Sequence, residues 1–108
     1  MSRTDELLLN DIREALKLIT EFVDGMNCRQ FSSDLRTQSA VVRQLEIIGE
    51  AAKRVSDATR VEYPSVPWST LARMRDKLIH AYHSVDPQVV WDTVEADLPT
   101  LSKTLSVS

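Results

Sequence analysis

The stretch SDLRTQSAVVRQLEIIGEAAKRVSDA, residues 33–58, decides the fold of this chain. Its apolar side chains recur every three or four residues, which is the spacing of one face of an α-helix. They are Val41, Leu45, Ile48, Ala52 and Val55. Ser33 or Asp34 supplies the N-terminal cap. The stretch therefore predicts one helix that runs to about Ala58, and at roughly 25 residues it would span the whole domain.

Three further segments carry helical signals. Residues 4–24 repeat the same apolar spacing. A third helix is predicted with Pro67 in its first turn, after a proline-containing break in the periodicity. A fourth covers residues 86–105, opens with an acidic cap followed by proline, and is kinked or interrupted at Pro99. The sequence thus predicts an all-α, antiparallel four-helix bundle, with residues 1–108 as a single domain.

Charge is distributed unevenly along the chain. The net charge of -3 argues against a protein that coats nucleic acid indiscriminately. Residues 1–24 hold three basic and six acidic side chains, and residues 86–108 hold one and four. Residues 53–77 reverse the balance, with six basic and three acidic side chains. This segment is either a basic patch able to hold a polyanion or a set of solvated helix faces.

Cysteine content and hydropathy indicate the compartment. The single Cys28 cannot form an internal disulfide, and we expect it to be a small side chain that only fills space. Neither a secretory signal nor a long uncharged span is visible. We therefore expect a cytoplasmic protein that does not contact a membrane.

The most pointed chemical signal is RMRDKLIHAY, residues 73–82. Arg75 offers bidentate phosphate recognition, and His80 is a side chain that titrates near neutral pH. On one ideal helix the two diverge by roughly 140°. Either the helix is distorted near its end, or the site is shared between two copies. We prefer a symmetric dimer that meets through this helix and brings two Arg75 and two His80 into one cleft.

The motif and its surroundings resemble a known family. Arg-x4-His at the end of the third helix of a small bundle resembles the HEPN domain, and Arg-x4-His-x-Tyr, residues 75–82, is similar to the HepT ribonuclease toxins. Many HEPN domains have Asn after the Arg, where this chain has Asp76. The other matching segments are Arg43-Gln44-Leu45-Glu46-Ile47-Ile48-Gly49-Glu50-Ala51-Ala52, Tyr63-Pro64, Val66-Pro67-Trp68, Val85-Asp86 and Asp97-Leu98-Pro99.

The resemblance implies a metal-independent endoribonuclease that is the toxin of a type VII-like toxin–antitoxin system. A ribose 2'-OH would attack the adjacent phosphorus, with His80 as the proton carrier and Arg75 stabilising charge on the phosphoryl oxygens. Asp76 and Lys77 would support them. An MNT-type nucleotidyltransferase antitoxin would attach AMP to Tyr82 and so block the anion site. No cofactor is implied, and RNA is the substrate.

Other interpretations of the same residues stay open. In a non-catalytic HEPN subunit that binds a nucleotide or a partner protein, Arg75 would bind phosphate, His80 would be structural and Tyr82 would line an interface. In a plain helical dimerisation module, Arg75 and His80 would be dispensable. His80 and His83 are spaced for a metal but lack an obvious third ligand.

The two tryptophans, Trp68 and Trp91, are expected to be core or interface anchors rather than platforms for stacking bases.

Overall fold

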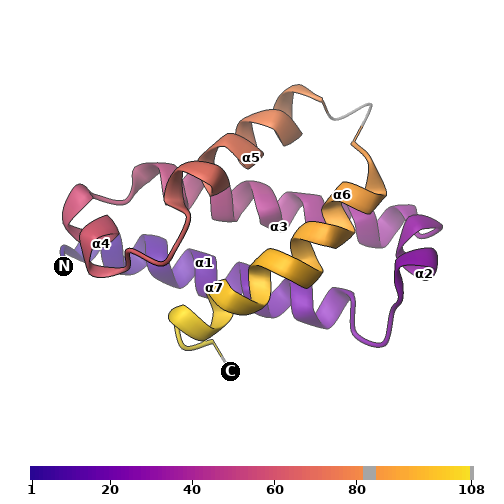
Figure 1. Cartoon of the computed structure of the whole chain (residues 1–108), viewed down its shortest axis with the longest axis horizontal. Helices are drawn as coiled ribbons and strands as arrows, with labels where there is room; N and C mark the ends of the chain where they lie inside the picture. Colours follow the sequence, from indigo (N-terminus) through magenta and orange to yellow (C-terminus); the bar gives the residue numbers. More distant parts are fainter. Residues whose placement is uncertain (82–84, 108) are drawn as a thin grey trace.

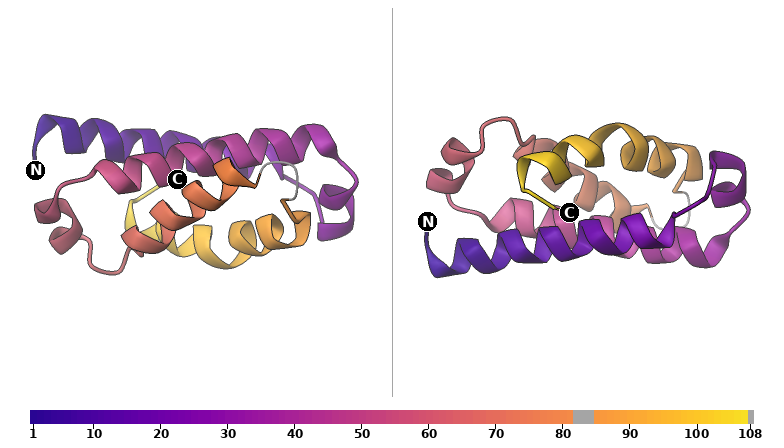
Figure 2. Two further views of the ribbon diagram at one scale, coloured as in Figure 1. Left: turned by 90° about the horizontal axis from the view of Figure 1, so that it is seen from above. Right: turned by 90° about the horizontal axis from the view of Figure 1, so that it is seen from below.

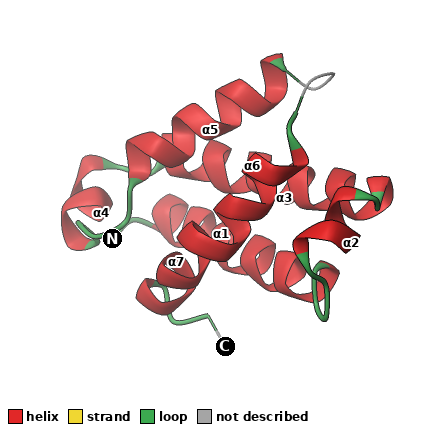
Figure 3. Ribbon diagram, turned by 45° about the vertical axis from the view of Figure 1, so that its right-hand side comes forward, coloured by secondary structure: helices red, strands yellow, loops and turns green. Residues whose placement is uncertain are grey.

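A computed structural model describes residues 1–81 and 85–107, and in these residues every regular element is a helix (Figures 1 and 3). The predicted all-α class is therefore confirmed. The elements are α1 (Arg3–Phe22), α2 (Cys28–Ser32), α3 (Leu35–Arg54), α4 (Asp57–Glu62), α5 (Trp68–His80), α6 (Pro87–Asp92), the π-helical turn η1 (Thr93–Asp97) and α7 (Leu98–Thr104).

Four helical rods alternate in direction. The long helices α1 and α3 lie side by side, α5 runs back across α3, and α6, η1 and α7 form the last rod (Figures 1 and 2). The molecule is flat for a bundle, with extents of 41 × 30 × 19 Å. Because α5 crosses α3 obliquely, its C-terminal end stands at the edge of the molecule (Figure 1).

The predicted starts of the two long helices are confirmed. Ser2 caps α1 by accepting a hydrogen bond from the Asp5 backbone N–H at 3.1 Å. Asp34 caps α3 by accepting one from the Thr37 N–H at 3.0 Å. Each cap satisfies a backbone donor that the first turn of a helix leaves unpaired.

The prediction that the second helix continues to Ala58 is wrong. The chain turns extended at Val55, with ψ 147°, and Ser56 caps a separate short helix, α4. The cause is distant in sequence, because the Asp5 carboxylate accepts hydrogen bonds from the Ser56 N–H at 3.0 Å and from the Thr59 hydroxyl at 2.8 Å. This tertiary contact overrides the local helical pattern.

The short helix α2 was absent from the sequence prediction. Asn27 and Gln30 form a capping box, in which each side chain accepts a hydrogen bond from the other residue's backbone N–H at 2.9 Å. Phe31 is fully buried, and the centroid of its ring lies 5.4 Å from the ring centroid of Trp91. Five residues are too few to show a helical period, which explains the omission.

Prolines define the remaining boundaries. Pro67 occupies the N-cap position of α5 rather than its first turn, which corrects the prediction by one residue. Asp86 caps α6, with Pro87 at its first position as predicted. The predicted interruption near Pro99 is also confirmed, since η1 ends two residues before it. Proline lacks an N–H and its ring crowds the carbonyl four residues earlier, so the turn before it widens.

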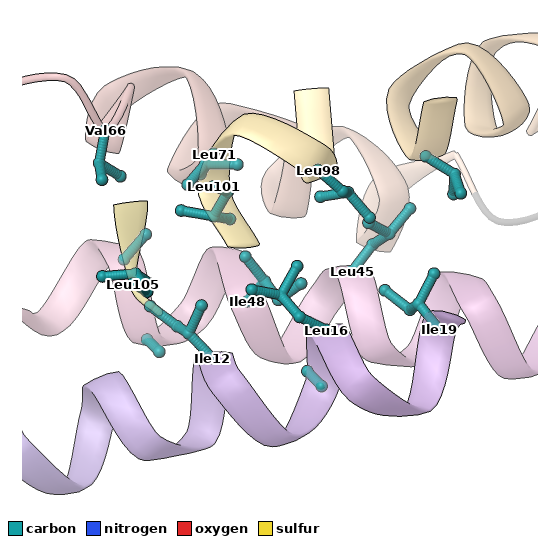
Figure 4. Packing of buried hydrophobic residues seen from close by; sticks show 14 of the residues in the cluster. Ile12, Leu16, Ile19, Leu45, Ile48, Val66, Leu71, Leu98, Leu101 and Leu105 are labelled. Atoms are coloured by element: carbon teal, nitrogen blue, oxygen red, sulfur yellow. The ribbon is translucent and has the colours of Figure 1, made fainter. Parts of the chain in front are cut away.

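One hydrophobic core joins the rods, and Figure 4 shows its centre, where α1, α3, α5 and α7 meet. Both tryptophans belong to it, as expected for anchors, and the Trp68 indole donates a hydrogen bond to the Tyr63 carbonyl at 3.1 Å. Among the residues described here, no helix has the length and apolar run needed to cross a bilayer.

Candidate active site

The helix α5 carries the predicted site residues and is held by its apolar face. Trp68, Leu71 and Leu78 are buried against the core, so the opposite face points to solvent. The helix is a regular α-helix from Trp68 to His80. Of the two alternatives that the sequence left open, a distortion near the end of the helix is therefore not found in the described part of α5.

Gly49 brings α5 unusually close to α3. A Cβ added at Gly49 would lie 2.7 Å from the Leu71 carbonyl oxygen and 3.2 Å from the Arg75 Cα, and would collide with the Arg75 Cβ. A glycine in the middle of a helix costs roughly 1 kcal/mol relative to alanine. Here the glycine allows a close contact that a larger residue would prevent, and this contact places the Cα and Cβ of Arg75 directly on α3.

Arg75 is held between two carboxylates. Its Nε forms an ion pair with Glu50 Oε2 of α3 at 3.1 Å, and its Nη1 donates a hydrogen bond to Asp76 Oδ1 at 3.0 Å. The Arg75 side chain keeps 28% of its surface exposed. The guanidinium is thus fixed from one side and reachable from the other.

Asp76 links Arg75 to a second cation. Its Oδ1 also lies 3.9 Å from Lys53 Nζ of α3. The hydrogen bond from Arg75 lowers the pKa of the Asp76 carboxyl below its usual value, partial burial opposes that shift, and the charges of Lys53, Arg75 and His80 add to the lowering. Asp76 therefore stays ionised at neutral pH and balances the cations around it.

His80 is the last residue of α5 and is exposed. Because α5 is regular, His80 and Arg75 point in directions roughly 140° apart. His80 lies one turn beyond Asp76, close enough for its charge to act on that carboxyl. The structure thus connects Arg75 with Asp76 and places His80 beside Asp76, while Arg75 and His80 diverge.

Lys77 lies on the exposed side of α5, away from Arg75. It lines a groove of about 450 Å³ between α5 and the last rod, together with Arg73, Met74 and Val89. The prediction that Lys77 supports Arg75 is not reflected in any ion pair or hydrogen bond between them within the described residues.

Two residues of the sequence prediction lie outside the described residues, namely Tyr82 and His83. The described residues contain no group of three or more His, Cys, Asp or Glu side chains arranged to hold a metal ion. Cys28, expected only to fill space, is half-buried, and its thiol donates a hydrogen bond to Gln88 Oε1 at 3.1 Å.

Sequence reasoning missed the part of the site that α3 contributes. Gly49 and Glu50 contact Arg75, and Lys53 contacts its neighbour Asp76, from a segment 22 or more positions away. The available signal was Gly49 itself, because a glycine inside a strong helical pattern indicates a close backbone approach.

Comparison with protein families matches residues 12–107 to the family described as ribonuclease HepT-like. A probable ribonuclease HepT of Thermococcus cleftensis is 48% identical over 101 residues, which cover 94% of this chain and 92% of that protein. A putative RNase of Methanocaldococcus jannaschii is 44% identical over 91 residues, 84% of this chain and 75% of that protein. Another, of Caldanaerobacter subterraneus subsp. tengcongensis, is 38% identical over 101 residues, 94% and 90% of the two chains. No solved structure matches the chain.

Proposed function

Because this chain belongs to the HepT-like ribonuclease family and is an RNA endonuclease, we propose that Arg75 and His80 carry its chemistry. The observation that supports this assignment is the state of Arg75, which is fixed by Glu50 and Asp76 on one side while part of its surface stays open. A fixed, accessible guanidinium is suited to a phosphodiester.

The proposed reaction is a transesterification. The ribose 2'-oxygen bonds to the adjacent phosphorus and the bond from phosphorus to the 5'-oxygen breaks, which leaves a 2',3'-cyclic phosphate and a 5'-OH. A neutral His80 takes the proton from the 2'-OH, and a protonated His80 gives one to the departing 5'-oxygen. Arg75 stabilises the negative charge that builds on the phosphoryl oxygens. The residues assigned to these steps need no divalent metal.

Two subunits form the proposed site. A single regular helix directs Arg75 and His80 apart, whereas a two-fold pairing of α5 helices would set Arg75 of one copy beside His80 of the other. The two-fold axis repeats this pair, so the dimer holds two equivalent sites, and in each site one His80 takes the proton from the 2'-OH and then gives it to the 5'-oxygen.

Cleavage of an end-labelled RNA in the presence of EDTA tests the catalytic assignment. The wild-type protein should produce fragments with 5'-OH ends, and His80→Ala should lower the rate by about 10²-fold or more. Arg36→Ala, which removes an exposed arginine on α3, is the control and should cut normally. An unchanged rate in His80→Ala would contradict the proposal.

Mixed dimers test the shared site. Arg75→Ala and His80→Ala subunits are each inactive alone, but a mixed dimer contains one site with both residues intact. Co-refolded mixtures should recover up to half of the wild-type activity per mixed dimer. Recovery of no activity, with mixed dimers present, would place each site within one subunit.

We further propose that the protein is the toxin of a toxin–antitoxin pair, silenced when an MNT-type nucleotidyltransferase transfers AMP to Tyr82. An adenylate phosphate near Arg75 would occupy the anion site and repel RNA. Expression of the chain alone should arrest growth, and Arg75→Ala should relieve the arrest. Peptide mass spectrometry after incubation with the partner enzyme and ATP should find AMP on Tyr82, and AMP on another residue would contradict the assignment.

A further inference from the structure

We infer that Glu50 is a positioning residue for Arg75, and that it raises the turnover of RNA although its charge opposes RNA binding. The inference rests on the proposed function, in which Arg75 contacts the scissile phosphate. Its starting point is the ion pair between Glu50 Oε2 and Arg75 Nε at 3.1 Å, which joins α3 to α5.

The backbone fixes where this ion pair forms. Gly49 allows the Arg75 Cα to lie directly over α3. Glu50, the next residue, is turned about 100° around that helix and so stands beside the guanidinium rather than beneath it. The carboxylate therefore meets Nε, the nitrogen nearest the helix, and leaves the outer nitrogens for a ligand.

The two carboxylates divide the guanidinium between them. Glu50 contacts Nε and Asp76 accepts from Nη1, so the plane of the group is restrained at two of its three nitrogens. Within the described part of the chain, Nη2 forms no ion pair or hydrogen bond. Nη2 and the second hydrogen of Nη1 form the edge that would contact a phosphoryl oxygen.

Burial separates this arrangement from an ordinary surface ion pair. The Arg75 side chain is 28% exposed, whereas Glu50 and Asp76 are each 44% exposed. A long arginine side chain loses considerable conformational freedom when it is held in one orientation. If Glu50 prepays that cost, the guanidinium needs no reorganisation when charge builds on the phosphate.

A positioning role and a purely electrostatic role predict opposite changes in kcat. If Glu50 were only a negative charge near the RNA path, Glu50→Ala would lower KM and leave kcat unchanged or higher. If Glu50 orients Arg75, the same variant lowers kcat by about tenfold while KM stays level or falls. Glu50→Gln has the same charge as Glu50→Ala but keeps the length and an acceptor oxygen, so its kcat should stay within about threefold of wild type.

The experiment measures kcat and KM for a short RNA with the full-length wild-type protein, Glu50→Ala, Glu50→Gln and Arg75→Ala, and with Glu50→Ala combined with Arg75→Ala. Glu14→Ala is the matched control, because it removes an exposed glutamate whose ion pair, with Lys17 at 3.6 Å, lies on α1. Thermal unfolding of each variant accompanies the kinetics, and Glu50→Met, which keeps the length of the side chain but has no oxygen to accept from Arg75, replaces Glu50→Ala if the alanine variant does not fold.

A tenfold loss of kcat in Glu50→Ala that is absent in the Arg75→Ala background would support the inference. If Arg75→Ala abolishes cleavage but Glu50→Ala keeps the wild-type kcat, the inference is overturned and the proposed function stands. If Arg75→Ala cleaves normally, both are overturned.

Discussion

Two carboxylate clusters connect helices in this molecule, and they differ in how much hydrogen-bonding capacity they leave open to a ligand. In the first, Asp5 of α1 accepts hydrogen bonds from the backbone and hydroxyl of Ser56, at 3.0 and 2.5 Å, and from the hydroxyl of Thr59 at 2.8 Å. Asp5 is 3% exposed. In the second, Glu50 and Asp76 hold Arg75 at the surface.

The donor and acceptor counts explain the difference. The three donors around Asp5 use both of its oxygens, and its burial leaves no access for a ligand. Arg75 has five N–H donors and two carboxylate partners, which leaves binding capacity at an exposed edge. A saturated cluster stabilises the fold, and an unsaturated one is available for function.

The largest expected effect separates the two clusters: a change in the Arg75 cluster should lower activity, whereas a change in the Asp5 cluster should lower stability. Arg75→Ala should lower the rate of RNA cleavage by about 10²- to 10³-fold, because charge on the phosphoryl oxygens loses its partner. Its melting temperature should change little. Asp5→Asn should lower the melting temperature clearly while the cleavage rate of the folded protein stays at the wild-type level. Calorimetry and a cleavage assay on both variants check these expectations. If the two variants lost activity and stability to the same extent, the two clusters would not differ in role.

Gly49→Ala tests the packing beneath Arg75 by the sign of its effect. Helix propensity alone predicts a gain in folding free energy of about 1 kcal/mol. Overlap with α5 instead predicts a net loss of about 1–3 kcal/mol and a displaced Arg75. Urea unfolding gives the sign, and Ser39→Ala, at an exposed position of α3, is the control. If Gly49→Ala stabilised the protein, α3 and α5 would be able to move apart without a loss of folding free energy.

Acid unfolding should report on the Asp5 cluster. Hydrogen bonds from Ser56 and then Thr59 lower the pKa of Asp5 from 3.8 to about 2. A lowered pKa in the folded state means that the ionised carboxylate stabilises the fold above about pH 3.8, and that this contribution is lost as the pH falls toward 2. The stability difference between wild type and Asp5→Asn should therefore shrink between pH 5 and pH 2. Urea unfolding across that range measures it, and a constant difference would assign the stabilisation to packing.

The smallest effect concerns Asp76. Asp76→Asn keeps an oxygen that can accept from Arg75 but removes a negative charge beside the proposed RNA path. RNA affinity should rise by about two- to fivefold at low salt and return to the wild-type value at high salt. Fluorescence anisotropy with a labelled RNA checks it. Weaker binding would show that the carboxylate, rather than its geometry, holds Arg75 in place.

Sequence patterns predicted the rods of the fold because the rods depend on local periodicity. The helix over residues 4–24 and the cap at Asp34 were found by apolar spacing and by cap chemistry. The break at Val55 was missed because it depends on Asp5, whose partner Ser56 is 51 residues away. Single-sequence patterns contain no record of such contacts.

The candidate site divides in the same way. Arg75, Asp76 and His80 lie within one short motif, so their spacing on a helix followed from the sequence. Glu50 could not be identified as a site residue from the sequence, because it meets Arg75 only where α3 and α5 cross. Which side chain an arginine meets on a neighbouring helix is decided by crossing angle and close approach, and neither is written in a local pattern.

The widened turn at Thr93–Asp97 sets the rotational phase of everything that follows it in the chain. Leu98 and Leu101, which follow that turn, are both buried in the core. Removing one residue there would rotate α7 by about 100° and swing its leucines toward water. An alignment that places a gap in this turn therefore equates inward-facing positions of one relative with outward-facing positions of another.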